Sequence, residues 1–240
     1  MSNDLSPRIK RHEFANPTVL AAALAQSVAD DLRAALQARD GASLALSGGN
    51  TPKAFMQALA RQPLDWSRIA VTLVDERWVP ENHPRSNAHL LRENLLQGPA
   101  SAATFLPLYR ATPEPEAALD ELERDLATSM PWPLDVAVLG MGEDGHTASF
   151  FPGGDRLAQA LDPAGGARVL PMRAPGAGEP RITLTLPALL QATHLYLHVE
   201  GEAKRRVLDQ AVTGAGEGEH FPIRGVLRHA TSPVRTYWSA

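Results

Sequence analysis

The residues most able to do chemistry gather between Leu139 and Gly153, where the sequence reads LGMGEDGHTASFFPG. An imidazole such as that of His146 can take up a proton near neutral pH and return it. Asp144 could fix the imidazole tautomer or hold a substrate hydroxyl, and Gly142 could expose a backbone N–H group beside it. The stretch therefore predicts a loop that presents a general base. The alternative is a structural histidine that caps a short helix.

The same stretch contains a dinucleotide-binding pattern, because Gly140, Gly142 and Gly145 spell G-x-G-x-x-G. That pattern should open a long helix in the first βαβ unit, with an acid at the end of the second strand. Here it lies more than halfway along the chain, and Pro152 keeps any following helix short. Asp162 stands near the expected acid spacing, but in the loop-like sequence LDPAGG. We therefore reject an NAD site.

A second motif, SGGNTP, begins at Ser47. Gly48 and Gly49 allow the backbone to approach a ligand closely and to adopt positive φ. Asn50 and Thr51 lead into a predicted helix, whose N-terminus offers unpaired N–H groups and the positive end of a dipole. The motif predicts an anion site suited to phosphate. A plain strand–turn–helix junction with Thr51 as the N-cap is the alternative.

Four further charged residues stand beside other predicted strands. Arg77, in the sequence DER, could clamp an oxyanion through two N–H groups, and Asp75 could orient it or a substrate hydroxyl. Lys204 lies in the first turn of a predicted helix, where a cation opposes the helix dipole and so favours an anionic partner. Arg181 opens the strand RITLTL and could reach the same anion. A local ion pair, a solvated lysine and a surface arginine are the respective alternatives.

The remaining histidines predict no metal site. His194 and His198 share one face of a strand without a third ligand, and His83 and His89 stand six residues apart across a proline. None has a zinc-binding spacing such as H-E-x-x-H. The chain also has no cysteine, which excludes disulfides, thiolate catalysis and cysteine-ligated metal.

The elements that must position these residues alternate along the chain. Predicted strands cover residues 42–46, 69–74, 105–109, 136–139, 168–172, 182–186, 194–199 and 234–238, and predicted helices cover 17–39, 53–60, 86–96, 115–130, 187–191 and 202–212. This alternation predicts an α/β fold with a doubly wound, mostly parallel sheet and helices on both faces. The polar motifs then meet at the carboxyl edge of the sheet, where open α/β sheets bind ligands.

Composition limits the class of protein. The segments between the elements read as surface loops, so residues 1–240 are expected to form a single domain. The net charge of -4 argues against a general binder of nucleic acid or anionic membrane. The N-terminal sequence MSNDLSPRIKRHEF has no apolar signal core, and no apolar run approaches the roughly 20 residues of a membrane span. These features favour a cytoplasmic protein.

Taken in order, SGGNTP, DERWVP with SNAHLLRENLL, GMGEDGHTASFFPG, RITLTLPAL and GEAKRRVL resemble the glucosamine-6-phosphate isomerase/6-phosphogluconolactonase family, and its lactonases in particular. The resemblance covers nearly the whole chain. Its most specific motif, GxGxDGHTAS-x-FPG, is fully present, and Asn50 and Phe150 are minor variants. The resemblance implies the three-layer glucosamine-6-phosphate deaminase-like fold. It also implies hydrolysis of 6-phospho-D-glucono-1,5-lactone to 6-phosphogluconate in the pentose phosphate pathway, without cofactor or metal.

The resemblance also implies roles for the residues above. His146 would be the base that activates water, and loop N–H groups or Arg77 would hold the oxyanion. The 6-phosphate would bind residues 47–51 and Lys204, together with Arg77 or Arg181. The expected partner is a small phosphorylated sugar lactone, with no nucleic acid or membrane, and the chain is expected to be a monomer or weak homo-oligomer.

Two other functions are compatible with such a fold. In the related deaminases the loop continues after Gly-His with an Asn-Glu pair, whereas residues 147–151, TASFF, supply no carboxylate here. A sugar-phosphate sensor would carry an added helix-turn-helix, for which only the short N-terminal arm is spare. Ammonia release, or ligand binding without turnover, would identify these alternatives.

Overall fold

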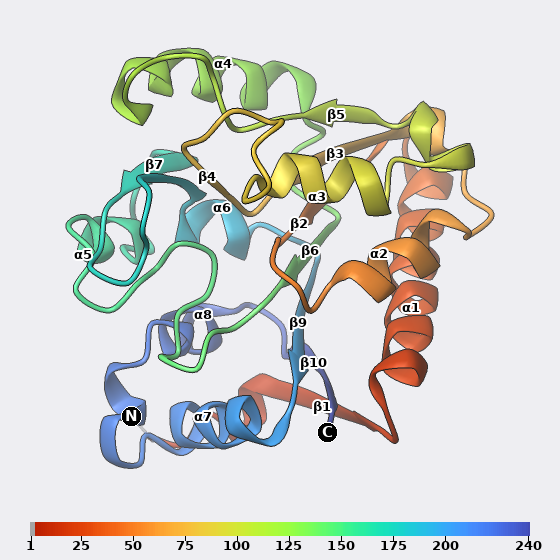
Figure 1. Cartoon of the computed structure of the whole chain (residues 1–240). Helices are drawn as coiled ribbons and strands as arrows, with labels where there is room; N and C mark the ends of the chain where they lie inside the picture. The colour runs from red at the N-terminus through yellow and green to blue at the C-terminus, as the bar shows by residue number, and fades with distance from the viewer. Residues whose placement is uncertain (1–2) are drawn as a thin grey trace.

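The computed structural model describes residues 3–240. Their fold is built around a central seven-stranded sheet (Figure 1). The strand order is β1-β10-β9-β6-β2-β3-β5, and every neighbouring pair is parallel. The strands are β1 (Ile9–Phe14), β2 (Ala42–Leu46), β3 (Ile69–Leu73), β5 (Thr104–Leu106), β6 (Val136–Leu139), β9 (His194–Glu200) and β10 (Val234–Ser239). The predicted α/β fold with a mostly parallel sheet is confirmed.

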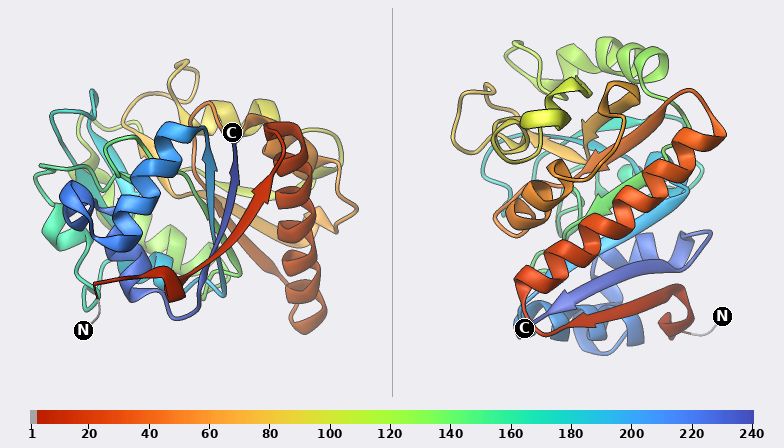
Figure 2. Two further views of the ribbon diagram at one scale, coloured as in Figure 1. Left: turned by 90° about the horizontal axis from the view of Figure 1, so that it is seen from below. Right: turned by 90° about the vertical axis from the view of Figure 1, so that its right-hand side faces the viewer.

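Helices cover both faces of this sheet. α1 (Pro17–Ala38) lies on one side of β1, β10 and β9, and α7 (Glu202–Thr213) lies on the other (Figure 2, left). Leu20, Leu24 and Val28 form part of the apolar stripe of α1, and all three are completely buried. The other helices are α2 (Lys53–Ala60), α3 (Asn87–Asn94), α4 (Leu119–Ser129), α5 (Leu157–Ala160), α6 (Leu186–Leu190) and α8 (Ile223–His229), and the short 3₁₀ turns are η1 (Ser6–Arg8), η2 (Trp66–Arg68), η3 (Gly98–Ala102), η4 (Pro115–Ala118) and η5 (Gly216–His220).

A second, antiparallel sheet stands beside the first, in the order β4-β8-β7. Its strands are β4 (Asp75–Arg77), β8 (Arg181–Leu184) and β7 (Val169–Met172). The chain passes between the sheets at Val74, whose N–H donates to Leu46 of the main sheet while its carbonyl accepts from Leu184. Two strands predicted from the sequence, 168–172 and 182–186, therefore lie outside the parallel sheet.

The structure also corrects several predicted elements. The N-terminal arm is not spare, because residues 9–14 form the edge strand β1. Its sequence IKRHEF is largely charged, as suits an edge strand, and so lacks the apolar alternation of a core strand. Helix α8 was not predicted, and the helix expected over 115–130 is divided into η4 and α4. The N-cap position of α2 is Pro52 rather than Thr51, and in the described part of the chain no side chain caps that helix.

The topology reverses between β2 and β6. From β2 the chain builds outward through β3 to β5, and from β6 it builds in the other direction through β9 to β10. Such switch points leave a crevice at the carboxyl ends of the two strands. The N–H of Ser47 donates to the carbonyl of Val138 at 3.0 Å, and the N–H of Gly140 donates to Oγ of Ser47 at 3.2 Å. The SGGNTP and GMGEDGH loops are thus joined at this point.

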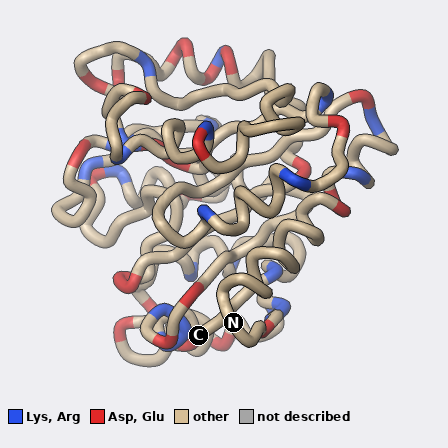
Figure 3. Tube along the Cα trace, turned by 45° about the vertical axis from the view of Figure 1, so that its right-hand side comes forward, with Lys and Arg blue, Asp and Glu red and all other residues tan. Residues whose placement is uncertain are grey.

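Charged residues are spread over the chain rather than gathered in one block. Figure 3 shows Lys and Arg interspersed with Asp and Glu along the trace. Between residues 3 and 240, no helix combines the length and apolar character needed to cross a membrane. The polar residues at the switch point therefore become the main candidates for a ligand site.

Candidate active site

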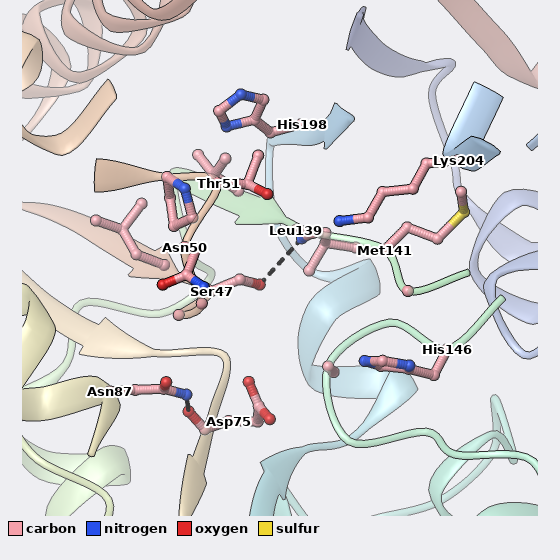
Figure 4. A pocket seen from close by; sticks show the side chains of 18 of the residues that line it. Ser47, Asn50, Thr51, Asp75, Asn87, Leu139, Met141, His146, His198 and Lys204 are labelled. Carbon is pink, nitrogen blue, oxygen red and sulfur yellow. Dashed lines mark hydrogen bonds between the residues drawn. The ribbon is translucent and has the colours of Figure 1, made fainter. Parts of the chain in front are cut away.

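A pocket of about 270 Å³ opens at the switch point (Figure 4). The predicted site residues that line it are Ser47, Gly48, Gly49, Asn50, Thr51, Asp75, Arg77, Gly142, His146, Arg181 and Lys204. They come from the loops after β2 and β6, from β4 and β8, and from the start of α7. The structure thus brings together residues that are far apart in the sequence. Asp144 does not line the pocket and lies behind His146 instead.

His146 and Asp144 form a hydrogen-bonded pair. Asp144 Oδ1 lies 2.5 Å from Nδ1 of the imidazole and 3.1 Å from the backbone N of His146. Partial burial alone would raise the pKa of Asp144, but the hydrogen bonds and charge of His146 outweigh it and hold that pKa below its ordinary value. An ionised Asp144 accepts from Nδ1–H, which leaves the lone pair on Nε2. This geometry favours fixing of the tautomer over binding of a substrate hydroxyl by Asp144.

Glycine is required where the loop folds back on this pair. Gly142 N donates to the carbonyl of His146 at 2.9 Å, and Gly145, at φ +73°, donates to the carbonyl of Gly142 at 3.1 Å. A Cβ on Gly142 would lie 2.3 Å from both Cε1 and Nδ1 of the imidazole. The next helix, α5, begins only at Leu157, so His146 does not cap a helix.

The SGGNTP loop rests on Asn87, the first residue of α3. A Cβ on Gly48 would lie 1.9 Å from Oδ1 of Asn87, so only glycine allows this approach. Asn87 in turn donates through Nδ2 to the carbonyl of Asp75 at 2.8 Å (Figure 4). Gly49 adopts φ +99°, and the loop then enters the N-terminus of α2. Asn87 lines the pocket but was not predicted, because its contact with Gly48 depends on the tertiary fold.

Two arginines stand side by side on the second sheet. Arg77 and Arg181 are direct partners in the antiparallel register of β4 and β8, so their side chains leave the same face. Arg181 is only 5% exposed, donates to the carbonyl of Ala177 at 2.7 Å and lies 3.7 Å from Oδ2 of Asp75. Burial lowers the pKa of Arg181, although Asp75 opposes this. Paired guanidinium groups in a pocket wall attract an anion.

Asp75 is held by a buried hydroxyl. Its Oδ2 accepts from Oγ of Ser149 at 2.6 Å, and the N–H of Ser149 donates to Oγ1 of Thr183 at 3.2 Å. Between His146 and this serine, Ala148 lines the pocket with φ 51°, the left-handed region that non-glycine residues rarely adopt. The HTAS sequence thus turns sharply and connects the histidine loop to β4 and β8 of the second sheet.

Glu76 points away from the pocket and secures the start of α3. Its carboxylate is completely buried and accepts from the backbone N–H groups of Arg77, Asn87 and Ala88 and from the hydroxyl of Ser86, at 2.7–3.0 Å. Burial raises the pKa of Glu76, and these hydrogen bonds oppose it. The residue therefore fixes the backbone at two pocket-lining positions.

The last polar groups are Lys204 and His198. In Figure 4, Lys204 extends from α7 toward the loop that carries Ser47 and Thr51. Over residues 3–240, no Asp or Glu carboxylate lies within 4.0 Å of its Nζ, so Lys204 forms no ion pair with a described carboxylate. His198 also lines the pocket, with Nε2 hydrogen-bonded to Glu200 at 2.9 Å. Among the same residues, no group of three or more His, Asp or Glu is placed to hold a metal ion.

A hydrogen-bonded histidine–aspartate pair therefore lies at the same site as two guanidinium groups and the N-terminus of a helix, at the position where doubly wound sheets bind ligands. Fold and site together define an α/β enzyme that acts on a small anionic molecule.

The family model described as "Glucosamine-6-phosphate isomerases/6-phosphogluconolactonase" matches residues 15–238, and the chain belongs to this family. Its sequence is 53% identical over 228 residues to the 6-phosphogluconolactonase of Rhizobium meliloti (strain 1021), covering 95% of this chain and 97% of that protein. It is 51% identical to the 6-phosphogluconolactonase of Mesorhizobium japonicum, covering 94% and 93% of the two chains. The family resemblance inferred from the motifs is confirmed.

Solved structures agree with this assignment. The 6-phosphogluconolactonase from Shewanella baltica OS155 superposes with a TM-score of 0.93 at 39% identity, covering 99% of this chain and 100% of that one. A monomeric glucosamine-6-phosphate deaminase superposes with a TM-score of 0.72 at 18% identity, covering 96% and 97% of the two chains, which shows a shared fold alone. The predicted deaminase-like fold is thereby confirmed.

Proposed function

We propose that this chain is a 6-phosphogluconolactonase, which hydrolyses 6-phospho-D-glucono-1,5-lactone to 6-phospho-D-gluconate in the oxidative branch of the pentose phosphate pathway. The observation that carries the proposal is His146, which is paired with Asp144 and lines the same pocket as Arg77, Arg181 and Lys204. The 53% and 51% identical relatives bear this enzyme's name along nearly their whole length. A lactone hydrolase needs a base for water, and a phosphorylated substrate needs cations.

In the proposed reaction, Nε2 of His146 removes a proton from water while the water oxygen forms a bond to the lactone carbonyl carbon. The carbonyl electron pair moves onto its oxygen, giving a tetrahedral anion. The anion then collapses, the bond to the ring oxygen breaks, and the imidazolium returns its proton to that oxygen. The carboxylic acid so formed loses its proton to solvent. The carboxylate of Asp144 stabilises the imidazolium, and general-base help of this kind is worth about 10²–10⁴-fold.

The remaining pocket residues receive binding roles in this proposal. The 6-phosphate lies against the N–H groups of residues 47–51 at the N-terminus of α2, with Lys204 and the Arg181 guanidinium as counter-charges. Arg77 or the N–H groups of the histidine loop stabilise the tetrahedral oxyanion. Asp75, with one oxygen held by Ser149, offers its other oxygen to a sugar hydroxyl.

The proposal includes no metal and no organic cofactor, since the histidine pair supplies the proton transfer. We further propose that residues 1–240 act as one domain, as a monomer or weak homo-oligomer in the cytoplasm. Exhaustive dialysis against EDTA should then leave the hydrolysis rate unchanged.

The first test is lactone hydrolysis by the wild type and by His146→Ala on freshly generated substrate, corrected for spontaneous hydrolysis. Binding of 6-phosphogluconate is measured on the same two proteins. The expected result is an active wild type and a variant that binds the product but loses activity by orders of magnitude. A variant that retains most of its activity would refute the general-base role. An inactive wild type that binds sugar phosphates would favour a sensor, and ammonia release from glucosamine 6-phosphate would favour a deaminase.

A further inference from the structure

One aromatic ring touches two of the functional side chains. Phe151 is 5% exposed and lines the pocket. Its ring centroid lies 4.5 Å from that of the His146 imidazole, and the two planes are inclined by 31°. The guanidinium carbon of Arg181 lies 5.3 Å from the centroid of the same ring. The ring therefore connects the proposed base of one loop with a cation on β8.

The hydrogen bonds of His146 and Arg181 do not by themselves fix the orientation of the two side chains. The imidazole of His146 is hydrogen-bonded through Nδ1 to Asp144, and a single bond at one edge of a ring leaves it free to pivot. Arg181 donates to Ala177 at 2.7 Å, but its Nε is buried and has no hydrogen-bond partner among the described residues 3–240. Contact with an aromatic face limits the rotation of both groups.

Phe151 is itself fixed by the backbone around it. Its N–H donates to the carbonyl of Ser149 at 3.0 Å, and its carbonyl accepts from Gly154 at 3.0 Å. The turn before it contains the left-handed residue Ala148, and Pro152 follows it. The ring is thus mounted on a constrained segment rather than on a mobile loop, as a positioning element requires.

The ring also has an electrostatic effect. An aromatic face is negative and attracts a cation placed over it. His146 becomes cationic when it takes the proton from water, so contact with the ring favours that form. The other charged groups at the site are Asp144, which is hydrogen-bonded to the imidazole, and Asp75, Arg77 and Lys204, which line the same pocket.

We propose that Phe151 is a positioning residue for the reaction, which holds His146 and Arg181 at a set separation and stabilises the protonated imidazole through its ring. The inference rests on the proposed lactonase function and deepens it. It predicts that loss of this one ring disturbs both chemistry and substrate binding, whereas loss of either neighbour disturbs mainly one.

The test compares Phe151→Leu with Phe150→Leu and Phe151→Tyr. Phe150 is a matched control, because it is the adjacent phenylalanine, completely buried, and does not line the pocket. Phe151→Leu is expected to lower kcat by about tenfold to a hundredfold, the scale of a displacement near 1 Å, and to raise KM severalfold. Phe151→Tyr keeps the ring, so its kcat and KM should stay close to those of the wild type. Phe150→Leu should lower thermal stability yet retain near-wild-type kinetics below its unfolding temperature.

The pH profile separates positioning from packing. Without the ring, the imidazolium loses the attraction of the aromatic face, so the acid limb of kcat/KM should move to lower pH in Phe151→Leu. The midpoint of the His146 titration, followed through the imidazole C–H resonance by NMR, should also move to lower pH in this variant. Equal losses in the two leucine variants, with unchanged profiles, would overturn the inference.

The NMR titration needs no turnover and therefore keeps this inference separate from the proposed function. If the wild type fails to hydrolyse the lactone, the proposed function fails. The titration of His146 in Phe151→Leu then still supports or refutes the ring contact.

Discussion

Replacement of Gly142 by alanine adds one methyl group beneath the histidine pair and should disable the enzyme without unfolding it. The new Cβ would lie 2.3 Å from Cε1 and Nδ1 of His146 and 2.5 Å from Oδ1 of Asp144. Ordinary van der Waals contact begins near 3.4 Å, so the pair must move by roughly 1 Å. A displacement of that size costs about 10²-fold in rate, which corresponds to about 2.7 kcal/mol of transition-state stabilisation.

The steric effect of the new Cβ on the His146–Asp144 pair can be separated from the general effects of replacing a glycine. The φ of Gly142 lies outside the left-handed region, so alanine introduces no strain of that kind. Gly166→Ala is the matched control, since its Cβ would meet no atom within 4 Å and its φ is also outside that region. The assay is lactone hydrolysis with the spontaneous rate subtracted, together with the thermal midpoint and 6-phosphogluconate binding for both variants.

Gly142→Ala should bind product nearly as well as the wild type and lose about a hundredfold in kcat, whereas Gly166→Ala should be unchanged in every measurement. A folded Gly142→Ala protein with kcat within threefold of wild type would refute this reasoning. It would mean that the loop tolerates a shift of the His146–Asp144 pair, and that their geometry does not limit the rate.

Three further outcomes are expected. Asp144→Asn should lower kcat by about 10²–10⁴-fold by altering the tautomer of His146. In the wild type, the pKa of Asp144 lies below its ordinary value, so the stabilisation of the fold by this carboxylate is fully present above the ordinary carboxyl pKa. That stabilisation should be lost as the pH falls through the lowered pKa. Glu76→Gln should lower the free energy of unfolding in urea by about 1–3 kcal/mol, because one buried donor such as the N–H of Ala88 would face the amide nitrogen instead of an oxygen. Lys204→Met should raise the dissociation constant for 6-phosphogluconate by roughly tenfold, about 1.4 kcal/mol, while leaving kcat within a few-fold, as calorimetry and steady-state kinetics would measure.

The sequence was sufficient for the main sheet where periodicity was strong. The apolar runs that became β2 and β6 and the long stripe of α1 lie within a residue or two of their predicted bounds. The antiparallel sheet was not predicted, because β4 has only three residues and its pairing with β8 joins segments about a hundred residues apart. Periodicity within a segment carries no information about which strand it will pair with.

The candidate site also contains some features that the sequence predicts and others that it does not. The glycine loop could be predicted, since His146 and Asp144 meet within a few residues of sequence. The contacts of Phe151 with both His146 and Arg181 could not, because they require the second sheet to be folded against the loop. The bond between Ser149 and Asp75 likewise spans 74 residues. The side chains proposed to do the chemistry could be recognised by residue type, whereas the contacts that hold them depend on tertiary structure.

Binding of an anionic ligand at the arginine pair of the second sheet would make the stability of the folded protein depend on the supply of that ligand. Arg77 and Arg181 face the pocket as neighbouring like charges, so the empty protein carries a repulsion that an anionic ligand converts into attraction. A ligand at a hundred times its dissociation constant stabilises the folded chain by about 2.7 kcal/mol, and so reduces the unfolded population about a hundredfold. Proteases that capture transiently opened chains would then degrade the idle enzyme faster than the working one.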